Sequence, residues 1–479
     1  MVVGGGGGAA PTPPLPPSSV AKHGPVFRSH LVGIPCVVVT SAPDIAAVMF
    51  GEHRVTEWYG VPSFTRLLGR SADASVQASK ERHGRRRRQQ ATAFTPDALA
   101  GYAPRVEAAT RSALARWAAA TGEAGGVDLY AALNVLTFDY AAATVVDLGL
   151  TREARAEVLA HWTAFTTSLF SLPIDAPGFP LRRGLRAKAR VVAALGDAVE
   201  AYRQAAGKET PSTMLGHYVA ARAADGDPVD AEELVDTTLG LLLAGHETSH
   251  SAHVALLGLL PALGADVRAA LEAEQAAVVA AHGDLLTPAA LAAMPVADAV
   301  SKECLRILGP AEGLFRRATA DFALSGRRVA AGDVLYVSNL YAKASDPGLG
   351  GIKGGVLPPA HMDANAAASS VRPDRWLGGP DPAPSADSFG LAFGLGRHAC
   401  LGAPLYAMEA KALLAVVVRE YDVAIVSATA WSPSWAAQGS RFRAGKAGIK
   451  IAFARRAAPL VAGGGGGAVG AAAPAGAAA

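Results

Sequence analysis

The chain has 479 residues, and 44 Lys and Arg against 41 Asp and Glu leave a formal net charge of only +3. This near balance gives no reason to expect a nucleic acid as the partner. Hydrophobic residues make up 51% of the chain, which is enough for a sizeable core. Three cysteines, Cys36, Cys304 and Cys400, cannot form a disulfide framework and indicate a reducing, intracellular compartment.

Neither end has the pattern of a targeting or membrane-spanning segment. The Gly/Pro-rich residues 1–22 lack the charged and apolar regions of a signal peptide. Residues 459–479 are rich in Gly and Ala and lack the large apolar side chains of a membrane helix. We expect both ends to be disordered, no transmembrane anchor, and one folded domain over residues 23–458.

Between the ends, the pattern is mainly helical with a minor β part. Two β-prone runs around Gly33 predict a hairpin over Val26–Thr40. Helices are predicted over Arg105–Thr121, Ala189–Ala205, Ala231–Leu260, from Pro288, from Pro295 to Leu308, and over Ala403–Val418. Strands are predicted at Phe322–Leu324, Val334–Ser338, Val423–Val426 and Ile449–Phe453, and residues 348–370 read as a long Gly/Pro/Ala-rich loop. This order argues against doubly wound and barrel folds.

A glycine-rich loop, FGLGRHACLG at Phe393–Gly402, places Cys400 just before a predicted helix. The free N–H groups and the dipole of a helix N-terminus stabilise an anion, so a thiolate is favoured there. The glycines would let the backbone approach a flat ligand. The alternative is that Cys400 is a small buried hydrophobic residue, as most lone cysteines are.

An acid and an alcohol, Glu247 and Thr248, lie in the middle of the apolar helix predicted over Ala231–Leu260. Such a pair is costly to bury without partners. Thr248 is expected to bond the carbonyl of Ala244, four residues earlier. The pair reads either as a proton-delivery pair lining a cavity or as a polar patch that binds internal water.

Two further clusters contain charged residues at helical spacing. Glu303 and Arg306 are three residues apart and can pair on one helix face, and Arg375 could complete a buried network; the alternative is an ordinary surface pair.

In HGRRRR, His83 and Arg87 are four residues apart and can face one anionic ligand. The alternative there is a solvated basic face or a localisation signal.

The four clusters, in this order, resemble the cytochrome P450 haem-thiolate monooxygenases over roughly residues 24–453. Within the family, the chain is most similar to the branch of retinoic-acid hydroxylases and cyanobacterial retinoid hydroxylases, through GPVFRSHLVG at Gly24, SLFSLPI at Ser168, LLLAGHETS at Leu241 and GLFR at Gly313. The resemblance implies the mainly α P450 fold with minor β as a single large haem-binding domain. It also implies haem b as cofactor, with an iron whose axial ligand is the Cys400 thiolate.

The resemblance implies roles for the other motif residues as well. Glu247 and Thr248 would be catalytic, organising protons and water for dioxygen cleavage. The haem would be bound by His83, Arg87, Arg316, Phe393, His398, Cys400 and Gly402, with His398 where most members have arginine. Glu303, Arg306 and Arg375 would form a structural network. The substrate pocket would comprise Trp58, Phe64, Leu169, Phe170, Ala244, Leu314 and Phe315, mostly apolar residues that suit a hydrophobic small molecule.

The expected reaction is therefore insertion of one oxygen atom of O2 into an isoprenoid such as an apocarotenoid, a retinoid or a sterol. Electrons would come from a separate protein, an NADPH-dependent flavin reductase or a ferredoxin, docking on Arg82, Arg85, Arg86, Arg88 and Arg397. The sequence does not determine the compartment; an intracellular protein could be cytoplasmic or peripheral on an organelle membrane, the endoplasmic reticulum or a plastid. Alternatives are a haem-thiolate isomerase or dehydratase of hydroperoxides, which Glu247 and Thr248 disfavour, and a haem-binding protein without turnover.

Overall fold

A computed structural model gives the structure of the chain. It describes residues 17–31, 33–69, 80–147, 151–205, 211–227, 229–311, 313–339, 342, 368, 370–379, 392–426, 431–434, 441–444, 449–458 and 460. The two terminal segments before 17 and after 460, and most of the loop expected at 348–370, lie outside these residues.

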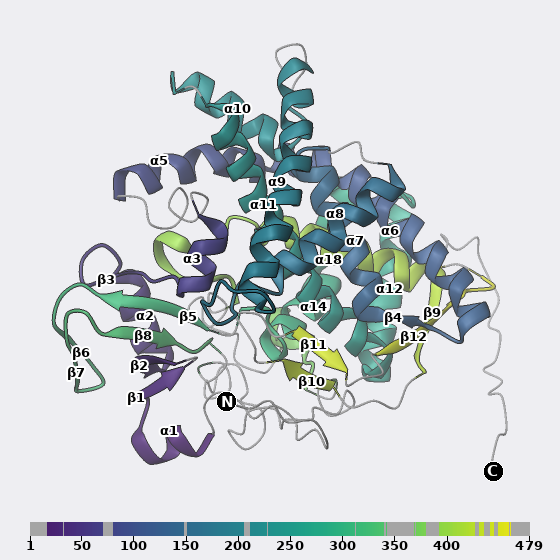
Figure 1. Ribbon diagram of the computed structural model, residues 1–479. Coiled ribbons are helices and arrows are strands. Elements are labelled where there is room, and N and C mark those ends of the chain that lie inside the picture. Colours follow the sequence, from purple (N-terminus) through teal and green to yellow (C-terminus); the bar gives the residue numbers. More distant parts are fainter. Residues whose placement is uncertain are drawn as a thin grey trace.

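Helices form the bulk of the molecule (Figure 1). The longer ones are α5 (Lys80–Ala91), α6 (Pro96–Ala124), α7 (Leu129–Val145), α8 (Arg152–Thr166), α9 (Pro180–Ala205), α10 (Met214–Ala224), α11 (Ala231–Leu259), α12 (Ala265–His282), α14 (Pro295–Ile307) and α18 (Ala403–Glu420). Shorter ones are α1 (Pro17–His23), α2 (Ala42–Phe50), α3 (Pro62–Leu68) and α13 (Pro288–Ala292), with 3-10 turns η1 (Thr92–Phe94), η2 (Leu260–Ala262), η4 (Pro373–Trp376) and η5 (Gly396–His398). The expected helices are all present.

The β part lies mainly beside the helices, at the left of Figure 1. Its largest sheet has the order β1-β2-β8-β5-β3, from β1 (Val26–Leu31), β2 (Ile34–Val39), β8 (Val334–Val337), β5 (Leu314–Ala318) and β3 (Thr56–Trp58). Small sheets pair β6 (Phe322–Leu324) with β7 (Arg327–Val329), β10 (Trp431–Ser434) with β11 (Arg441–Ala444), and β4 (Val127–Asp128) with β12 (Lys450–Arg455) and β9 (Tyr421–Ile425). The expected hairpin forms, with Val26 opposite Val39 and Gly33 at a φ of +78°.

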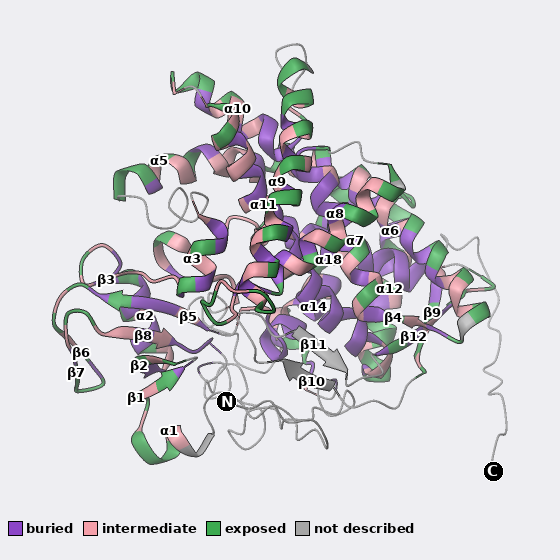
Figure 2. Ribbon diagram, in the orientation of Figure 1, coloured by how far each residue is buried: buried purple, intermediate pink, exposed green. Residues whose placement is uncertain are grey.

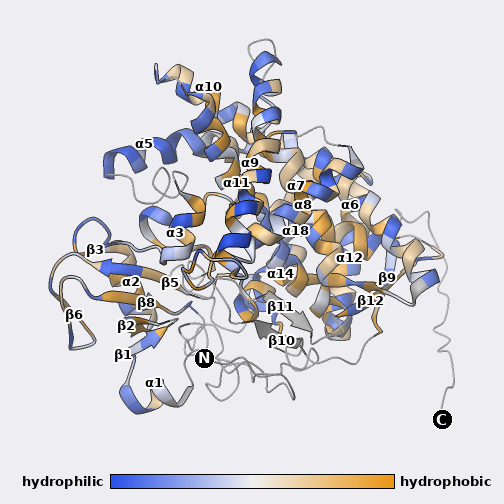
Figure 3. Ribbon diagram, in the orientation of Figure 1, coloured by the Kyte–Doolittle hydropathy of each residue, from blue (hydrophilic) through white to orange (hydrophobic). Residues whose placement is uncertain are grey.

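The core centres on α11, α14 and α18, whose buried residues are extensive in Figure 2. Nearly every side chain of α18 from Leu405 to Val418 is buried. By contrast α5, with its run of arginines, is largely hydrophilic (Figure 3). The cysteine loop directly precedes α18, so it is attached to one of these buried helices.

The N-terminal boundary needs one correction. Residues 17–22, expected to be disordered, belong to helix α1. Pro17 suits the first helical position because its fixed φ matches a helix there and its missing N–H is not needed. Val20 packs against the core that includes Leu31 and Cys36, so tertiary contacts stabilise this short helix.

Candidate active site

The glycine-rich loop holds Cys400 at the N-terminus of α18. Gly394 and Gly396 have φ angles of +77° and +69°, a region that favours glycine. A Cβ on Gly396 would also lie 2.7 Å from the carbonyl oxygen of Met49, so a side chain does not fit there. The amide of Cys400 donates to the carbonyl of Phe393 at 2.6 Å, which closes the loop.

Opposing effects act on the pKa of the Cys400 thiol. Burial raises its pKa, while hydrogen bonds from the amides of Gly402 and Ala403 and the charge of Arg87 act to lower it. These donors stabilise the thiolate form, which is the form that binds metals. The helix N-terminus thus faces the sulfur, as the sequence predicted.

Cys400 is accessible from a cavity of about 420 Å³. Its wall comes from α5, α7, α11, the start of β5 and the cysteine loop. Of the residues predicted for catalysis, cofactor binding and substrate binding, it includes Arg87, Ala244, Thr248, Leu314, Phe393, His398, Cys400 and Gly402. The thiol of Cys400 and the hydroxyl of Thr248 therefore lie on the wall of the same cavity.

The acid and the alcohol of α11 point to different surroundings. Thr248 Oγ1 donates to the Ala244 carbonyl at 2.6 Å, as predicted, and lines the cavity. Glu247 is not among the residues that line it. Its Oε1 lies 3.2 Å from Nε1 of Trp162 on α8 and 3.3 Å from Nδ1 of His246. Trp162 was not identified from the sequence, because nothing in its local pattern indicates a distant partner.

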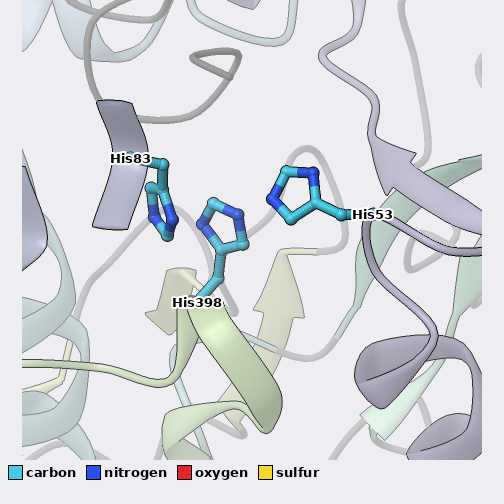
Figure 4. Close-up of side chains that lie close together, drawn as sticks. All are labelled: His53, His83 and His398. Atoms are coloured by element: carbon cyan, nitrogen blue, oxygen red, sulfur yellow. The ribbon is translucent and has the colours of Figure 1, made fainter. Parts of the chain in front are cut away.

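Histidines and arginines gather beside the cysteine loop. The rings of His83 and His398 stack with centroids 4.1 Å apart (Figure 4), and His398 Nε2 lies 2.8 Å from Glu52 Oε1. Burial lowers the pKa of His83 to about 4, helped by His398 and Arg87. Burial acts to raise the pKa of Glu52, but the hydrogen bond from His398 and the charge of Arg316 outweigh it, and the pKa is lowered.

The cations of this group fit an anionic, flat cofactor. Arg87 lines the cavity and donates to the carbonyl of Ala399. Arg316 is buried, lies 3.9 Å from Glu52, and its Nε has no hydrogen-bond partner among the described residues. A buried N–H without a partner is costly, so it indicates a missing acceptor such as a carboxylate.

Glu303, Arg306 and Arg375 form the expected buried network. Arg306 makes a bidentate pair with Glu303 at 2.9 and 2.8 Å, and Arg375 Nε lies 3.4 Å from the same carboxylate. Trp376 Nε1 and the amide of Arg372 also donate to Glu303, each at 2.8 Å. Glu303 thereby ties α14 to η4, and the surface-pair alternative is wrong.

Most of the residues expected in the substrate pocket lie outside this cavity. Trp58, Phe64, Leu169, Phe170 and Phe315 are absent from its wall. Phe64 packs against Trp58 and Phe170, with ring centroids 5.9 and 5.4 Å away, and Phe315 packs against Tyr336 at 5.1 Å. These aromatic rings pack against one another, which sequence spacing could not show. The cavity wall instead includes Phe94, Thr144, Val145, Met214, Leu241 and Leu305, none of which the motifs indicated.

The arginines of the HGRRRR segment and its neighbours do not all face the solvent. Arg82, Arg85, Arg88 and Arg397 are exposed. The side chain of Arg86 is only 12% exposed, pairs with Glu233, and lines the cavity. Arg86 therefore does not contribute to the expected docking surface, because it is paired with Glu233 of α11.

Among the described residues, no single helix has the length and apolar composition to cross a membrane. The bent pair Ala231–Ala262 and Ala265–His282, at 110° to each other, passes that test by length and composition only.

The chain is similar to known proteins along most of its length. The family model "Cytochrome P450" matches residues 19–348 and 366–441. The chain is 32% identical to human cytochrome P450 26C1 over 336 residues, covering 66% of this chain and 63% of that protein. It is 27% identical to bovine cytochrome P450 26B1 over 406 residues, covering 82% and 73%. The chain thus spans less than two thirds of the length of the first of these relatives.

A solved structure shares the fold. The structure titled "Retinoic acid bound cyanobacterial CYP120A1" superposes with a TM-score of 0.76 at 24% identity, covering 94% of this chain and 100% of that one. Members of the family bind haem through an axial cysteine thiolate, and the cavity beside Cys400 contains donors suited to that group. On its motifs, its fold and the extent of the family match, this chain belongs to the cytochrome P450 family.

Proposed function

We propose that this protein is a haem-thiolate monooxygenase that inserts one oxygen atom of O2 into a hydrophobic isoprenoid, with retinoids as the first candidates. The observation that supports it most is the placement of Cys400 and Thr248 on the wall of one cavity. A cysteine at a helix N-terminus would hold the haem iron, and a hydroxyl would lie where dioxygen reacts. Bound haem would supply the redox chemistry that splits dioxygen.

The residues around the haem would each have a distinct task. Cys400 would supply the axial sulfur, and the amides of Gly402 and Ala403 would stabilise its anionic form against the opposing effect of burial. Arg87, Arg316, His83 and His398 would hold the haem carboxylates, and Phe393 would cover the sulfur. The Thr248 hydroxyl donates to the Ala244 carbonyl. Its oxygen can still accept a hydrogen bond from a water molecule in the cavity.

Glu247 would deliver protons from behind α11 rather than from the cavity wall. Its carboxylate is tied to Trp162 and His246, on the side of the helix that faces α8. Protons would pass from this group to Thr248, its neighbour in the chain. Trp162 is then a positioning residue, because it acts through Glu247.

The substrate assignment is supported by the cavity and by the relatives. Apolar side chains such as Leu241, Leu305, Leu314 and Phe94 dominate the wall, which suits a hydrophobic molecule. The similar structure has retinoic acid bound, as its title states. An apocarotenoid or a sterol offers the same apolar surface and is the next class to test.

Electrons would come from an acidic redox protein, either a flavin reductase or a ferredoxin. The exposed side chains Arg82, Arg85, Arg88 and Arg397 lie on α5 and η5, the elements that carry Arg87 and His398 at the cavity. Basic side chains near the cofactor would attract an acidic partner.

The test combines a spectrum with turnover. The reduced, carbon monoxide-bound protein should show the far-red-shifted band of thiolate ligation, and Cys400→Ala should lose it. Cys36→Ala removes a buried cysteine that does not line the cavity and should keep the band, which controls for general damage. Purified protein with a reductase and O2 should then convert a retinoid, apocarotenoid or sterol to a hydroxylated product. Turnover of hydroperoxides without electrons, in place of this reaction, would identify the isomerase alternative.

A further inference from the structure

A fully buried histidine of α11 lies beside the acid of the acid-alcohol pair. The ring of His246 packs against Trp162 of α8 and Phe138 of α7, with centroids 6.0 and 5.7 Å away. Its Nδ1 is 3.3 Å from Oε1 of Glu247. His246 does not line the cavity, so the ring is not placed to contact the substrate.

The partners of the His246 ring determine which of its nitrogens carries the hydrogen. Nε2 lies 3.0 Å from the carbonyl oxygen of Asn134 on α7, which can only accept a hydrogen bond, so Nε2 donates. Nδ1 lies 2.8 Å from Nε1 of Trp162, which can only donate, so Nδ1 accepts. The neutral ring therefore carries its hydrogen on Nε2 and a lone pair on Nδ1.

The lone pair of Nδ1 faces a second acceptor. The indole N–H of Trp162 is 2.8 Å from His246 Nδ1 and 3.2 Å from Glu247 Oε1, and these two acceptors are 3.3 Å apart. Because the ring is buried, little water separates them, and their lone pairs repel each other unless a proton lies between them. One indole N–H cannot lie on both lines, so the geometry has a position for one further proton between Nδ1 and Oε1.

We propose that His246 and Glu247 share this proton and together hold it ready for Thr248. The inference rests on the proposed function, in which Glu247 supplies protons to Thr248. A carboxylic acid alone is ionised at neutral pH and has no proton to give, whereas an imidazole binds a proton close to neutrality. His246 is a positioning residue, because it acts through Glu247.

The proton transfer balances without any other reactant. Glu247 gives the shared proton toward Thr248, which leaves a neutral His246 with its hydrogen on Nε2 and a carboxylate that accepts from Trp162. The Glu247 side chain is 18% exposed, so a proton from water can restore the pair. No electron moves, and each turnover of the pair carries one proton.

Two conservative variants separate proton binding from hydrogen bonding. His246→Asn places an amide oxygen near the position of Nδ1 and can still accept from Trp162, while His246→Gln reaches the position of Nε2 and can still donate to the Asn134 carbonyl. Neither amide takes up a proton. Both variants should form more hydrogen peroxide per electron and turn over about 10-fold more slowly, part of the roughly 10²–10⁴-fold that a positioned proton donor contributes.

The matched control removes a different buried imidazole from the same helix. His253 lies two turns further along α11, its Nδ1 donates to the Ser249 carbonyl at 2.6 Å, and it does not line the cavity. His253→Gln should keep the coupling of the wild type. Haem content and the carbon monoxide spectrum are recorded for every variant, and unchanged values separate loss of the proton from misfolding.

Nuclear magnetic resonance reads the shared proton without turnover. Histidine is labelled with the heavy nitrogen isotope, the reduced carbon monoxide-bound protein is used because it is diamagnetic, and His246→Asn identifies the signals of His246. In the wild type, Nδ1 should resonate as a nitrogen that bears or shares a proton. In Glu247→Ala it should resonate as a nitrogen with a lone pair, because the partner that shares the proton is gone.

Three outcomes would overturn the shared proton: the same Nδ1 signal in the wild type and Glu247→Ala, wild-type coupling in both His246 variants, or an equal loss of coupling in His253→Gln. Failure of the proposed function is a different result. A wild type without the thiolate band, or without a hydroxylated product, would refute the monooxygenase, while the Nδ1 signal of the same protein still reports on the proton.

Discussion

Trp162 on α8 holds the carboxylate of Glu247 on α11, with 3.2 Å between Nε1 and Oε1. The same N–H lies 2.8 Å from His246 Nδ1, so one indole donor serves two neighbouring side chains. The acid of the acid-alcohol pair is thereby anchored away from the cavity, and only Thr248 reaches its wall.

Replacing Trp162 by Phe should impair proton delivery. The change removes one hydrogen bond to a charged group, about 1.5–3 kcal/mol, which corresponds to about 10-fold or more in rate. We expect lower turnover and more hydrogen peroxide per electron consumed, with the thiolate band unchanged. Trp117→Phe is the control, because Trp117 packs against Phe453 in the core away from the cavity. Equal coupling in the two variants would contradict the role of Trp162.

Replacing Glu303 by Gln should destabilise the fold. Arg306 and Arg375 would keep their charges in a buried site without the compensating carboxylate, at a cost of about 3–5 kcal/mol. Denaturant unfolding of the holoprotein measures this loss. Lys302→Gln breaks the neighbouring, partly exposed pair with Asp298 and should change stability by about 1 kcal/mol or less. Similar losses for both variants would refute the structural role of the network.

Glu409 should make stability fall as the pH rises. Burial between α18 and α11 raises the pKa of Glu409 to about 8, and its hydrogen bond from Ser249 only partly opposes this. The folded chain keeps this proton while the unfolded chain releases it near pH 4.3. Between about pH 5 and 8, this group therefore lowers the free energy of unfolding by at most about 1.4 kcal/mol per unit.

Comparing unfolding curves across pH tests the contribution of Glu409. Glu409→Gln keeps the shape of the side chain without the titration and should show a flatter decline than the wild type. Glu272→Gln, on partly exposed α12, should keep the wild-type slope. An unchanged slope in Glu409→Gln would mean that this carboxyl does not hold a proton in the folded state.

Reversing charge on α5 should slow reduction by an acidic partner. Arg85 is 61% exposed, and Arg88 is exposed on the same helix. Arg85→Glu with Arg88→Glu should slow reduction about 10-fold or more at low ionic strength and flatten its salt dependence, since steering is electrostatic. Stopped-flow reduction measures the rate. Arg328→Glu, on the exposed β6-β7 hairpin, should reduce normally. Wild-type rates in the double variant would place the partner elsewhere.

Local spacing determined much of the site. The placement of Cys400 before α18, the bond from Thr248 to Ala244 and the pairing of Glu303 with Arg306 all follow from residues within one turn of each other. Such contacts depend on backbone geometry that a sequence pattern encodes directly. The mainly helical fold followed in the same way from apolar periodicity.

Contacts between distant segments were decided only by the tertiary structure. Packing of α8 on α11 brings Trp162 to Glu247, and the turn after α2 brings His53 to His83. Packing also gave some residues surroundings that differ from the expected ones. Glu233 pairs with Arg86, and Phe64 packs against Phe170 and Trp58 outside the cavity wall. Sequence spacing determined which chemistry the chain can perform, because those groups are neighbours along the backbone. Packing determined what surrounds that chemistry, because side chains from distant segments compete for the same buried space.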